Sequence, residues 1–312
     1  MALPQTGIFA LGTSAHCYLE FDLAAGADPG RAAAVVAGLS EPRTTMGGVN
    51  LVLGYRPELW AGLLPEHAPA DLTGFDDDVV GPDGFTIPGT QHDLFCWIAG
   101  SANDVIFDTA VEIIGALAGL ATVADETIAW TYHRDLDLTG FIDGTENPSL
   151  SEAPRLILVP QGRPGAGGSV MLIQKWAHDT AAWTALGVTD QERAMGRTKS
   201  DSVELDPRPE ASHVARTDQD DFGDILRRNT AYGSPQQHGT MFVGFGAARA
   251  PLADMLDSMA GRGGTRDTLT RFTTPLTGGY YFIPSVEDLA LLNPAGDEAA
   301  ELARPPSETA ET

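Results

Sequence analysis

The sequence has few cysteines, few basic residues and no long hydrophobic run. Its two cysteines, Cys17 and Cys96, show no metal-ligand spacing, and reduced core thiols are typical of proteins that stay inside the cell. No stretch approaches the ~18 consecutive apolar residues of a membrane-spanning helix. Residues 1–6 lack the basic and apolar regions of a signal peptide. These absences predict a cytoplasmic protein with no membrane partner.

Basic residues are outnumbered by acidic ones, 19 Lys and Arg against 43 Asp and Glu, which gives a formal net charge of −24. This charge would repel nucleic acids and anionic membrane surfaces, so neither is an expected partner. Much of it lies in three acidic runs that are typical of solvated surfaces: residues 76–78, 218–224 and 297–311. Among small molecules that meet this surface, neutral or cationic ones are favoured over anionic ones.

The most informative segment is Gly-Phe-Ile-Asp-Gly-Thr-Glu-Asn-Pro, residues 140–148. Gly140 and Gly144 permit a tight turn or a close approach to a flat ligand, and Pro148 stiffens the end of the segment. One carboxylate, that of Asp143, is therefore presented on a short, stiff loop. The alternative is a strand end followed by an ordinary Asp-Gly turn.

Further motifs follow downstream in a fixed order. They are Gly-Arg-Thr-Lys at 196–199, Ser-His-Val-Ala-Arg-Thr at 212–217, Ile-Leu-Arg-Arg-Asn at 225–229 and Tyr-Phe-Ile-Pro-Ser at 281–285. Together with the Gly-x-x-Asp-Gly segment, this ordered set resembles the dye-decolorizing peroxidases, a family of haem peroxidases. It is most similar to the bacterial branch that lacks a secretion signal. The resemblance runs from about Gly7 to about Leu292.

The resemblance implies an enzyme with one haem b per chain. Such an enzyme uses hydrogen peroxide to oxidise small reducing substrates, such as dyes or phenolics, through a ferryl intermediate. His213 is implied as the axial ligand of the haem iron, with Asp143 as the proton shuttle and Arg227 as the electrostatic stabiliser on the distal face. Asn229 would orient a distal water or the peroxide. An ordinary Asp side chain has a pKa of ~3.9, so this base predicts useful activity at mildly acidic pH.

Each of these assignments has an alternative in the sequence. Seven histidines are present, lone histidines are most often structural, and no two have the His-x-x-x-His spacing of a helical zinc site. Arg227 could pair with Asp224 on a helical turn at the surface. A shift of one residue would give its role to Arg228, but the family's Arg-x-Asn spacing selects Arg227.

The surroundings of the haem are specified less closely by the sequence. A proximal histidine usually donates its second ring N–H to an acceptor, for which Glu287 and Asp288 are the candidates and Asp288 is preferred. The alternative is a pair of exposed acids at the start of a helix. Three basic residues could meet a haem propionate, and four aromatic residues could carry radicals to the surface or simply pack in the core. They are Arg197, Lys199 and Arg216, and Trp176, Trp183, Tyr280 and Tyr281.

Hydrophobic periodicity predicts an α+β fold in which strands and helices alternate in two similar halves. No Gly-x-Gly-x-x-Gly segment follows a strand, which argues against a dinucleotide-binding fold. The expected strands are 15–21, 49–53, 94–98, 128–132, 170–176, 241–245 and 280–283, and the expected helices are 31–39, 57–63, 103–117, 179–186 and 251–259.

These elements suggest two ferredoxin-like halves, residues 1–137 and 138–292, with the haem site in the second. In each half, helices would cover one face of an antiparallel sheet, and the halves would pack together in a barrel-like arrangement. Residues 293–312 have almost no large apolar side chain and are expected to form an acidic disordered tail.

Members of the resembled family commonly form oligomers, so a homo-oligomer is expected. C-terminal extensions in the family sometimes direct packaging into encapsulin shells. Residues 293–312 lack the apolar and Gly-Ser-Leu-like segments of such extensions, so a solubilising tail is favoured over packaging. Two alternatives to peroxidase turnover stay open: a haem-binding or carrier protein, and a protein that releases iron from haem.

Overall fold

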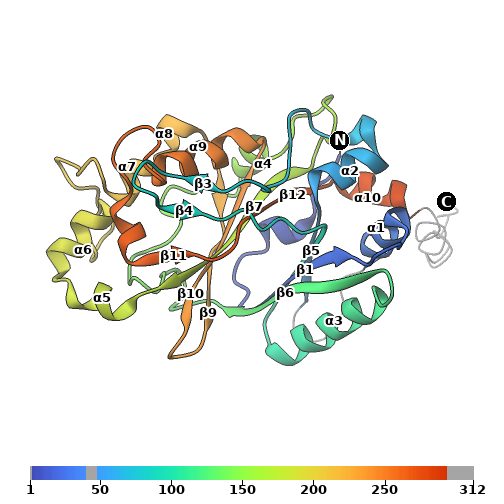
Figure 1. Cartoon of the computed structure of the whole chain (residues 1–312), viewed down its shortest axis with the longest axis horizontal. Helices are drawn as coiled ribbons and strands as arrows, with labels where there is room; N and C mark the ends of the chain where they lie inside the picture. Colours follow the sequence, from blue (N-terminus) through green and yellow to red (C-terminus); the bar gives the residue numbers. More distant parts are fainter. Residues whose placement is uncertain (1, 40–47, 294–312) are drawn as a thin grey trace, which may run out of the picture.

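The computed structural model describes residues 2–39 and 48–293, and its core is a ring of antiparallel strands (Figure 1). The strands follow the order β7-β12-β2-β5-β1-β6-β9-β10, and β10 pairs with β7 to close the ring. Two short strands extend it, β11 beside β7 and β8 beside β10. The strands are β1 (Ala15–Leu23), β2 (Asn50–Tyr55), β5 (Leu94–Gly100), β6 (Ala121–Trp130), β7 (Ser169–His178), β8 (Leu226–Arg227), β9 (Thr230–Gly233), β10 (His238–Gly246), β11 (Thr273–Pro275) and β12 (Gly279–Ile283), with a separate hairpin of β3 (Val79–Val80) and β4 (Thr86–Ile87).

Side chains fill the inside of the ring, as they do in other small barrels. Successive residues of a strand point to opposite faces, so one set from each strand turns inward. Tyr18, Trp97 and Tyr281 belong to one buried cluster inside the ring. Cys17 and Leu19 belong to a second cluster under the helices. Both faces of β1 are therefore buried, although the face of Tyr18 also carries the polar residues His16 and Glu20.

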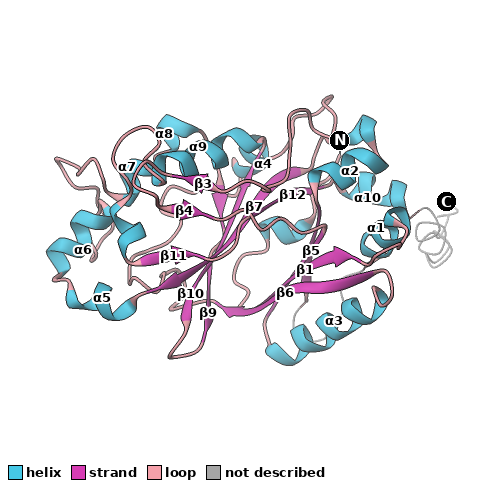
Figure 2. Ribbon diagram, in the orientation of Figure 1, coloured by secondary structure: helices cyan, strands magenta, loops and turns pink. Residues whose placement is uncertain are grey.

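Helices cover the outer faces of the ring in two groups, at opposite ends of the molecule (Figure 2). The first group lies over the N-terminal strands, where α3 packs against β1 and β5. In the second group, α9 packs against β7 and β10. The first group is α1 (Pro29–Ala37), α2 (Pro57–Leu63), α3 (Asn103–Ala116) and α10 (Val286–Leu292), and the second is α5 (Thr180–Ala185), α6 (Val188–Met195), α7 (His213–Arg216), α8 (Gln219–Phe222) and α9 (Arg249–Met259). The remaining short elements are α4 (Ala153–Ile157) and the 3-10 helices η1 (Thr6–Phe9), η2 (Pro65–His67) and η3 (Thr268–Arg271).

The predicted α+β class, with antiparallel strands, covering helices and a barrel-like arrangement, is confirmed. The strands of the two halves form one sheet, because β12 pairs with β2 and β6 pairs with β9. The division at residue 137 stays a prediction, and the predicted tail, apart from Asn293, lies outside the described residues. In the part of the chain that the structure describes, no helix has both the length and the apolar character needed to cross a bilayer.

Candidate active site

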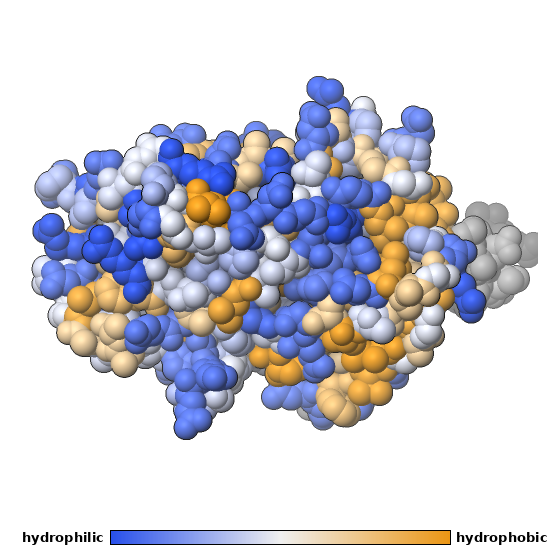
Figure 3. All heavy atoms as spheres, in the orientation of Figure 1, coloured by the Kyte–Doolittle hydropathy of each residue, from blue (hydrophilic) through white to orange (hydrophobic). Residues whose placement is uncertain are grey.

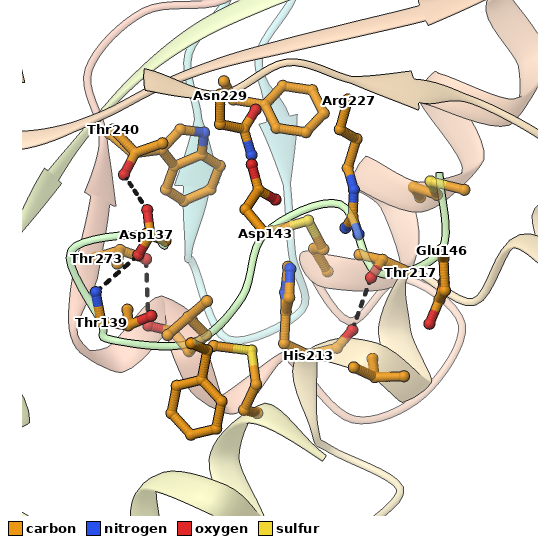
Figure 4. Close-up of a pocket in the computed structure, with 18 of the residues that line it drawn as sticks. Asp137, Thr139, Asp143, Glu146, His213, Thr217, Arg227, Asn229, Thr240 and Thr273 are labelled. Atoms are coloured by element: carbon orange, nitrogen blue, oxygen red, sulfur yellow. Dashed lines mark hydrogen bonds between the residues drawn. The ribbon is translucent and has the colours of Figure 1, made fainter. Parts of the chain in front are cut away.

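A pocket of roughly 1150 Å³, part of it open solvent, lies against the outer face of β7 and β10. The loop after β6 and helices α6, α7 and α9 complete its walls. Much of the lining is apolar, and a few polar side chains converge on the space (Figure 4). Four of the five predicted site residues line this pocket, namely Asp143, His213, Arg227 and Asn229. A mostly apolar lining with a few convergent polar groups is typical of a site for a small molecule or cofactor.

His213 is held at the first position of α7. The N-cap residue Ser212 accepts a hydrogen bond from the backbone N–H of Ala215, which fixes the start of this helix. The Nδ1–H of His213 donates to Oδ2 of Asp267 over 2.7 Å. Asp267 is fully buried, and its other oxygen accepts from the backbone N–H of Leu269 at 2.8 Å. With Nδ1–H as the donor, the neutral tautomer of this ring has its lone pair on Nε2, and the ring lines the pocket.

The predicted acceptor for His213 is therefore wrong. Asp288 lies in α10 and bonds to Nδ1 of His67 at 2.7 Å. Neither Asp288 nor the other candidate, Glu287, lines the pocket. Asp267 and Asp288 both lie at the start of a short helix. Local sequence does not distinguish them, because the acceptor is determined by which helix start packs beside α7.

The loop that carries Asp143 has the tight turns that its glycines predicted. Gly140 and Gly144 have φ values of +83° and +74°, which side-chain-bearing residues rarely adopt. A Cβ on Gly140 would also lie 2.8 Å from Cε of Lys199. The backbone N–H of Asp143 donates to the carbonyl of Asp135 at 2.8 Å. The backbone that carries Asp143 is thus held on both sides of this residue.

Several charges act on the carboxyl group of Asp143. Burial raises its pKa above the ordinary value, and the neighbouring Asp137 carboxylate adds to the rise. Arg227, a backbone hydrogen bond from Gly144 and His213 oppose it. Since the net effect is upward, this group exchanges its proton at higher pH than an ordinary aspartate. The expectation of useful activity at mildly acidic pH stays a prediction, and the raised pKa favours a higher acidic limit than an ordinary aspartate would give.

Arg227 lies on strand β8 and reaches the pocket. The alternative in which it pairs with Asp224 on a helical turn is excluded by this strand geometry. The neighbouring Arg228 turns away from the pocket. Its guanidinium lies 4.4 Å from the centre of the Trp97 ring, and Nη1 donates to the carbonyl of Gly7. The Arg-x-Asn spacing of the family thus selected, from the two neighbouring arginines, the one whose side chain lines the pocket.

Asn229 lies beside Asp143 in the pocket (Figure 4). Its Oδ1 accepts from the backbone N–H of Val243 at 3.1 Å. This bond fixes the amide so that the oxygen is engaged with β10 and the NH₂ group is presented as a donor. The side chain therefore offers hydrogen-bond donors next to the Asp143 carboxylate.

Of the three basic residues that could meet a haem propionate, only Arg197 lines the pocket. It bonds to Glu146 at 2.8 Å and to Glu204 at 2.6 Å. Lys199 donates instead to Gln191 and lies over Phe141. Among the four aromatic candidates, Trp176 lines the pocket, whereas Trp183, Tyr280 and Tyr281 are buried in the core.

Polar atoms without partners cluster around this pocket. Among the described residues, nine buried side-chain polar atoms make no hydrogen bond, and five of them belong to residues that line the pocket. Buried polar groups are normally satisfied, so unpaired groups require an explanation. The five are Thr139 Oγ1, Gln174 Nε2, Arg197 Nε, Ser202 Oγ and Arg227 Nε. A large apolar ligand with acidic substituents and a metal that takes a neutral imidazole fits this set, and haem has all three properties.

Three residues that contribute to this site were not identified from the sequence. Asp267 is the acceptor for His213. Asp137 accepts from Thr240 Oγ1 at 2.5 Å and faces Asp143. Asn147 belongs to the 140–148 segment, yet its contact is with a strand 80 residues away. All three depend on long-range pairing, and for Asn147 alone the motif itself was a usable signal.

Comparison with known proteins gives one consistent family. Residues 134–288 match the family model described as Dyp-type peroxidase, C-terminal. A dye-decolorizing peroxidase of Brevibacterium linens is 35% identical over 263 residues, which cover 81% of this chain and 71% of that protein. A dye-decolorizing peroxidase of Rhodococcus erythropolis is 33% identical over 304 residues, covering 92% of this chain and 88% of that protein.

Solved structures agree with this result. A variant of DypB from Rhodococcus jostii RHA1 in complex with haem is 33% identical, with a TM-score of 0.82 over 90% of this chain and 96% of that one. A dye-decolorizing peroxidase from Bacteroides thetaiotaomicron is 26% identical, with a TM-score of 0.83 over 93% of this chain and 98% of that one. Sequence identity, coverage and fold all lead to the same conclusion: the chain belongs to the dye-decolorizing peroxidase family.

Proposed function

We propose that this protein binds one haem b per chain and uses hydrogen peroxide to oxidise a small reducing substrate. The observation that supports it best is the arrangement of three side chains around one pocket. The His213 ring lies on one side, with Nδ1 bonded to Asp267, while Asp143 and Arg227 approach from the other (Figure 4). A ligand, a proton acceptor and a fixed positive charge are the groups that a haem peroxidase requires.

His213 would hold the haem iron through Nε2. Its bond to the buried Asp267 keeps the ring in one orientation and leaves the other ring nitrogen available for the iron. Arg197 is suited to a haem carboxylate, because its Nε is buried without a partner and its guanidinium lines the pocket. When bound, haem supplies the redox chemistry for the reduction of peroxide.

Asp143 and Arg227 would act on the peroxide itself. The Asp143 carboxylate takes the proton from one peroxide oxygen and returns it to the oxygen that leaves as water. Arg227 keeps its positive charge at any working pH and stabilises negative charge that develops as the O–O bond breaks. Asn229 offers its NH₂ group beside Asp143 and would orient the peroxide or a water. These roles divide the proton transfer and the charge stabilisation between two residues.

We also propose a homo-oligomer in the cytoplasm. Exposed apolar side chains gather around α3 and β6, where Phe107 is 66% and Ile128 48% exposed (Figure 3). Exposed apolar patches are typical of protein contacts. The free, buried thiols of Cys17 and Cys96 agree with a reducing compartment. The net charge favours neutral or cationic reductants, and encapsulin packaging is not favoured.

Stopped-flow mixing of the haem-loaded protein with hydrogen peroxide tests this proposal. A rapid change of the Soret band, followed by its return when a reductant is added, is the expected result. An unchanged Soret band would instead support a haem carrier. Loss of the band together with free iron, detected by a chelator, would support release of iron from haem.

A further inference from the structure

The side chain of Asn147 joins the loop of Asp143 to the strand of Arg227. Its Nδ2 donates to the carbonyl of Arg227 at 2.8 Å, and its Oδ1 accepts from the backbone N–H of Arg227, also at 2.8 Å. One side chain thus satisfies both backbone groups of a residue 80 positions away. A strand neighbour would form the same pair of bonds.

Strand β8 needs such a neighbour. It pairs with β10 on one edge, where Arg227 lies opposite Gly244 and Arg228 N–H bonds to the carbonyl of Val243. The N–H and C=O of Arg227 point to the other edge, and Asn147 occupies that edge. Unpaired backbone groups in this position would destabilise the fold if they were buried from water. Asn147 therefore completes a strand that carries only two residues.

The loop is shaped to deliver this amide. The backbone N–H of Asn147 bonds to the carbonyl of Gly144 at 3.0 Å, which turns the chain back immediately after Asp143. A Cβ on Gly144 would lie 2.6 Å from Nδ2 of Asn147. Glycine is thus required at 144 both for its positive φ and for the space that the amide occupies.

We propose that Asn147 is a positioning residue for peroxide activation, which fixes the Asp143 carboxylate relative to the Arg227 guanidinium. This inference rests on the proposed function, because it needs both groups to act on the peroxide. Arg227 Nε has no hydrogen-bond partner among the described residues. The place of its guanidinium therefore depends strongly on its backbone, which Asn147 holds. A misplacement of about 1 Å in such a site can cost on the order of 10²-fold in rate.

The test compares Asn147→Ala with Gln5→Ala in the haem-loaded protein. Gln5 offers a matched control, because its side chain forms the same bridge elsewhere: Oε1 accepts from the backbone N–H of Leu53 at 2.7 Å and Nε2 donates to the carbonyl of Leu53 at 2.9 Å. Gln5 does not line the active-site pocket. Both variants lose a two-bond bridge, and Gln5→Ala also loses a bond from Nε2 to the carbonyl of Pro284 at 3.0 Å. Gln5→Ala should therefore lose at least as much thermal stability as Asn147→Ala, so a slower peroxide reaction in Asn147→Ala alone does not follow from lost stability. Asn147→Asp, which keeps the size and one acceptor, covers the case in which Asn147→Ala does not fold.

We expect Asn147→Ala to slow the second-order reaction with hydrogen peroxide by about 10- to 100-fold, with Asn147→Asp between it and the wild type. Gln5→Ala should stay within about twofold of the wild type. In hydrogen–deuterium exchange, the amide of Arg227 should exchange faster in Asn147→Ala, which lacks the Oδ1 acceptor, and not in Gln5→Ala. This readout is independent of turnover. In an Arg227→Leu background, Asn147→Ala should cost less than it does alone, since part of its effect acts through the guanidinium.

Three results would overturn the inference. One is a peroxide rate for Asn147→Ala equal to that of Gln5→Ala, another is unchanged exchange at Arg227, and the third is full additivity with Arg227→Leu. A wild-type protein that does not react with peroxide would instead contradict the proposed function. The two failures are therefore distinguishable.

Discussion

Replacing Asp267 by Asn tests the proximal side of the site, because it keeps the volume of the side chain and changes only its hydrogen bonding. The carboxylate accepts from His213 Nδ1 at 2.7 Å and from the backbone N–H of Leu269 at 2.8 Å. An amide has only one acceptor oxygen. If that oxygen keeps the bond to Leu269, the NH₂ group faces His213 and Nδ1 must become the acceptor. The ring proton then moves to Nε2, the nitrogen that would bind iron.

The opposite rotamer of Asn is also unfavourable. In this rotamer the oxygen would accept the bond from His213, but the NH₂ group would face the N–H of Leu269. The N-terminal cap of η3 would then be lost, which lowers the free energy of unfolding by about 1 kcal/mol. Asp267 is 0% exposed, so water cannot replace the missing bond. Loss of such an acceptor typically lowers metal affinity by about 10- to 100-fold, or about 1.4–2.8 kcal/mol. We expect haem affinity to fall by this factor in Asp267→Asn.

The assay is transfer of haem from the protein to an excess of an apoglobin, followed in the Soret region. Asp288→Asn is the matched control, because Asp288 forms the same 2.7 Å bond to a histidine, His67, away from the pocket. Asp288→Asn should bind haem as the wild type does. If Asp267→Asn retains wild-type affinity and spectrum, or if Asp288→Asn loses as much, the assignment of Asp267 to the ligand is refuted.

Four further predictions concern the ligand, the distal residues, the pH dependence of activity and the interior of the barrel. His213→Ala should give a folded protein with weak or displaced haem, and an unchanged ferric spectrum at full occupancy would contradict the ligand assignment. Arg227→Leu should lower the second-order rate constant with peroxide more than Asp143→Ala does, because water relays a proton more readily than it supplies a fixed charge. Asn229→Ala should lower this rate constant least. A larger loss in Asp143→Ala than in Arg227→Leu would reverse this order. The activity of the wild type should also fall on the acid side at a higher pH than an ordinary aspartate would give, and this fall should weaken in Asp143→Ala. Burial raises the pKa of Glu20 from 4.5 to about 7, so the folded state holds this proton while the unfolded state releases it, and stability present below pH 4.5 is lost as the pH rises to 7. Glu20→Gln should remove this loss of stability, which is about 3 kcal/mol at pH 8. The measurement is chemical denaturation of the wild type and of Glu20→Gln at pH 5 and pH 8. The same pH dependence of the unfolding free energy in the two proteins would contradict the prediction.

The sequence was sufficient to predict elements whose signals are local. The helix at Pro57–Leu63 was predicted with the bounds that the structure has, because a proline marks its first turn. The strand from Leu94 was recognised from its continuous apolar run. By contrast, β8 and β9 have two and four residues, too few for a periodic pattern. These strands exist because β10 offers them an edge, and pairing between distant segments has no local signal.

In the site, too, local features were predictable from the sequence and long-range contacts were not. The loop of Asp143 carries its own turn chemistry in Gly140 and Gly144, so its shape follows from the sequence. The hydrogen-bond partner of His213 does not follow from the local sequence, because any acidic residue at a helix start within reach of α7 could accept this bond. His67 with Asp288 and His213 with Asp267 have the same 2.7 Å geometry. What separates a structural pair from a ligand pair is the space beside the second ring nitrogen. That space lies where β7, β10 and α9 come together, and no local segment of the sequence specifies it.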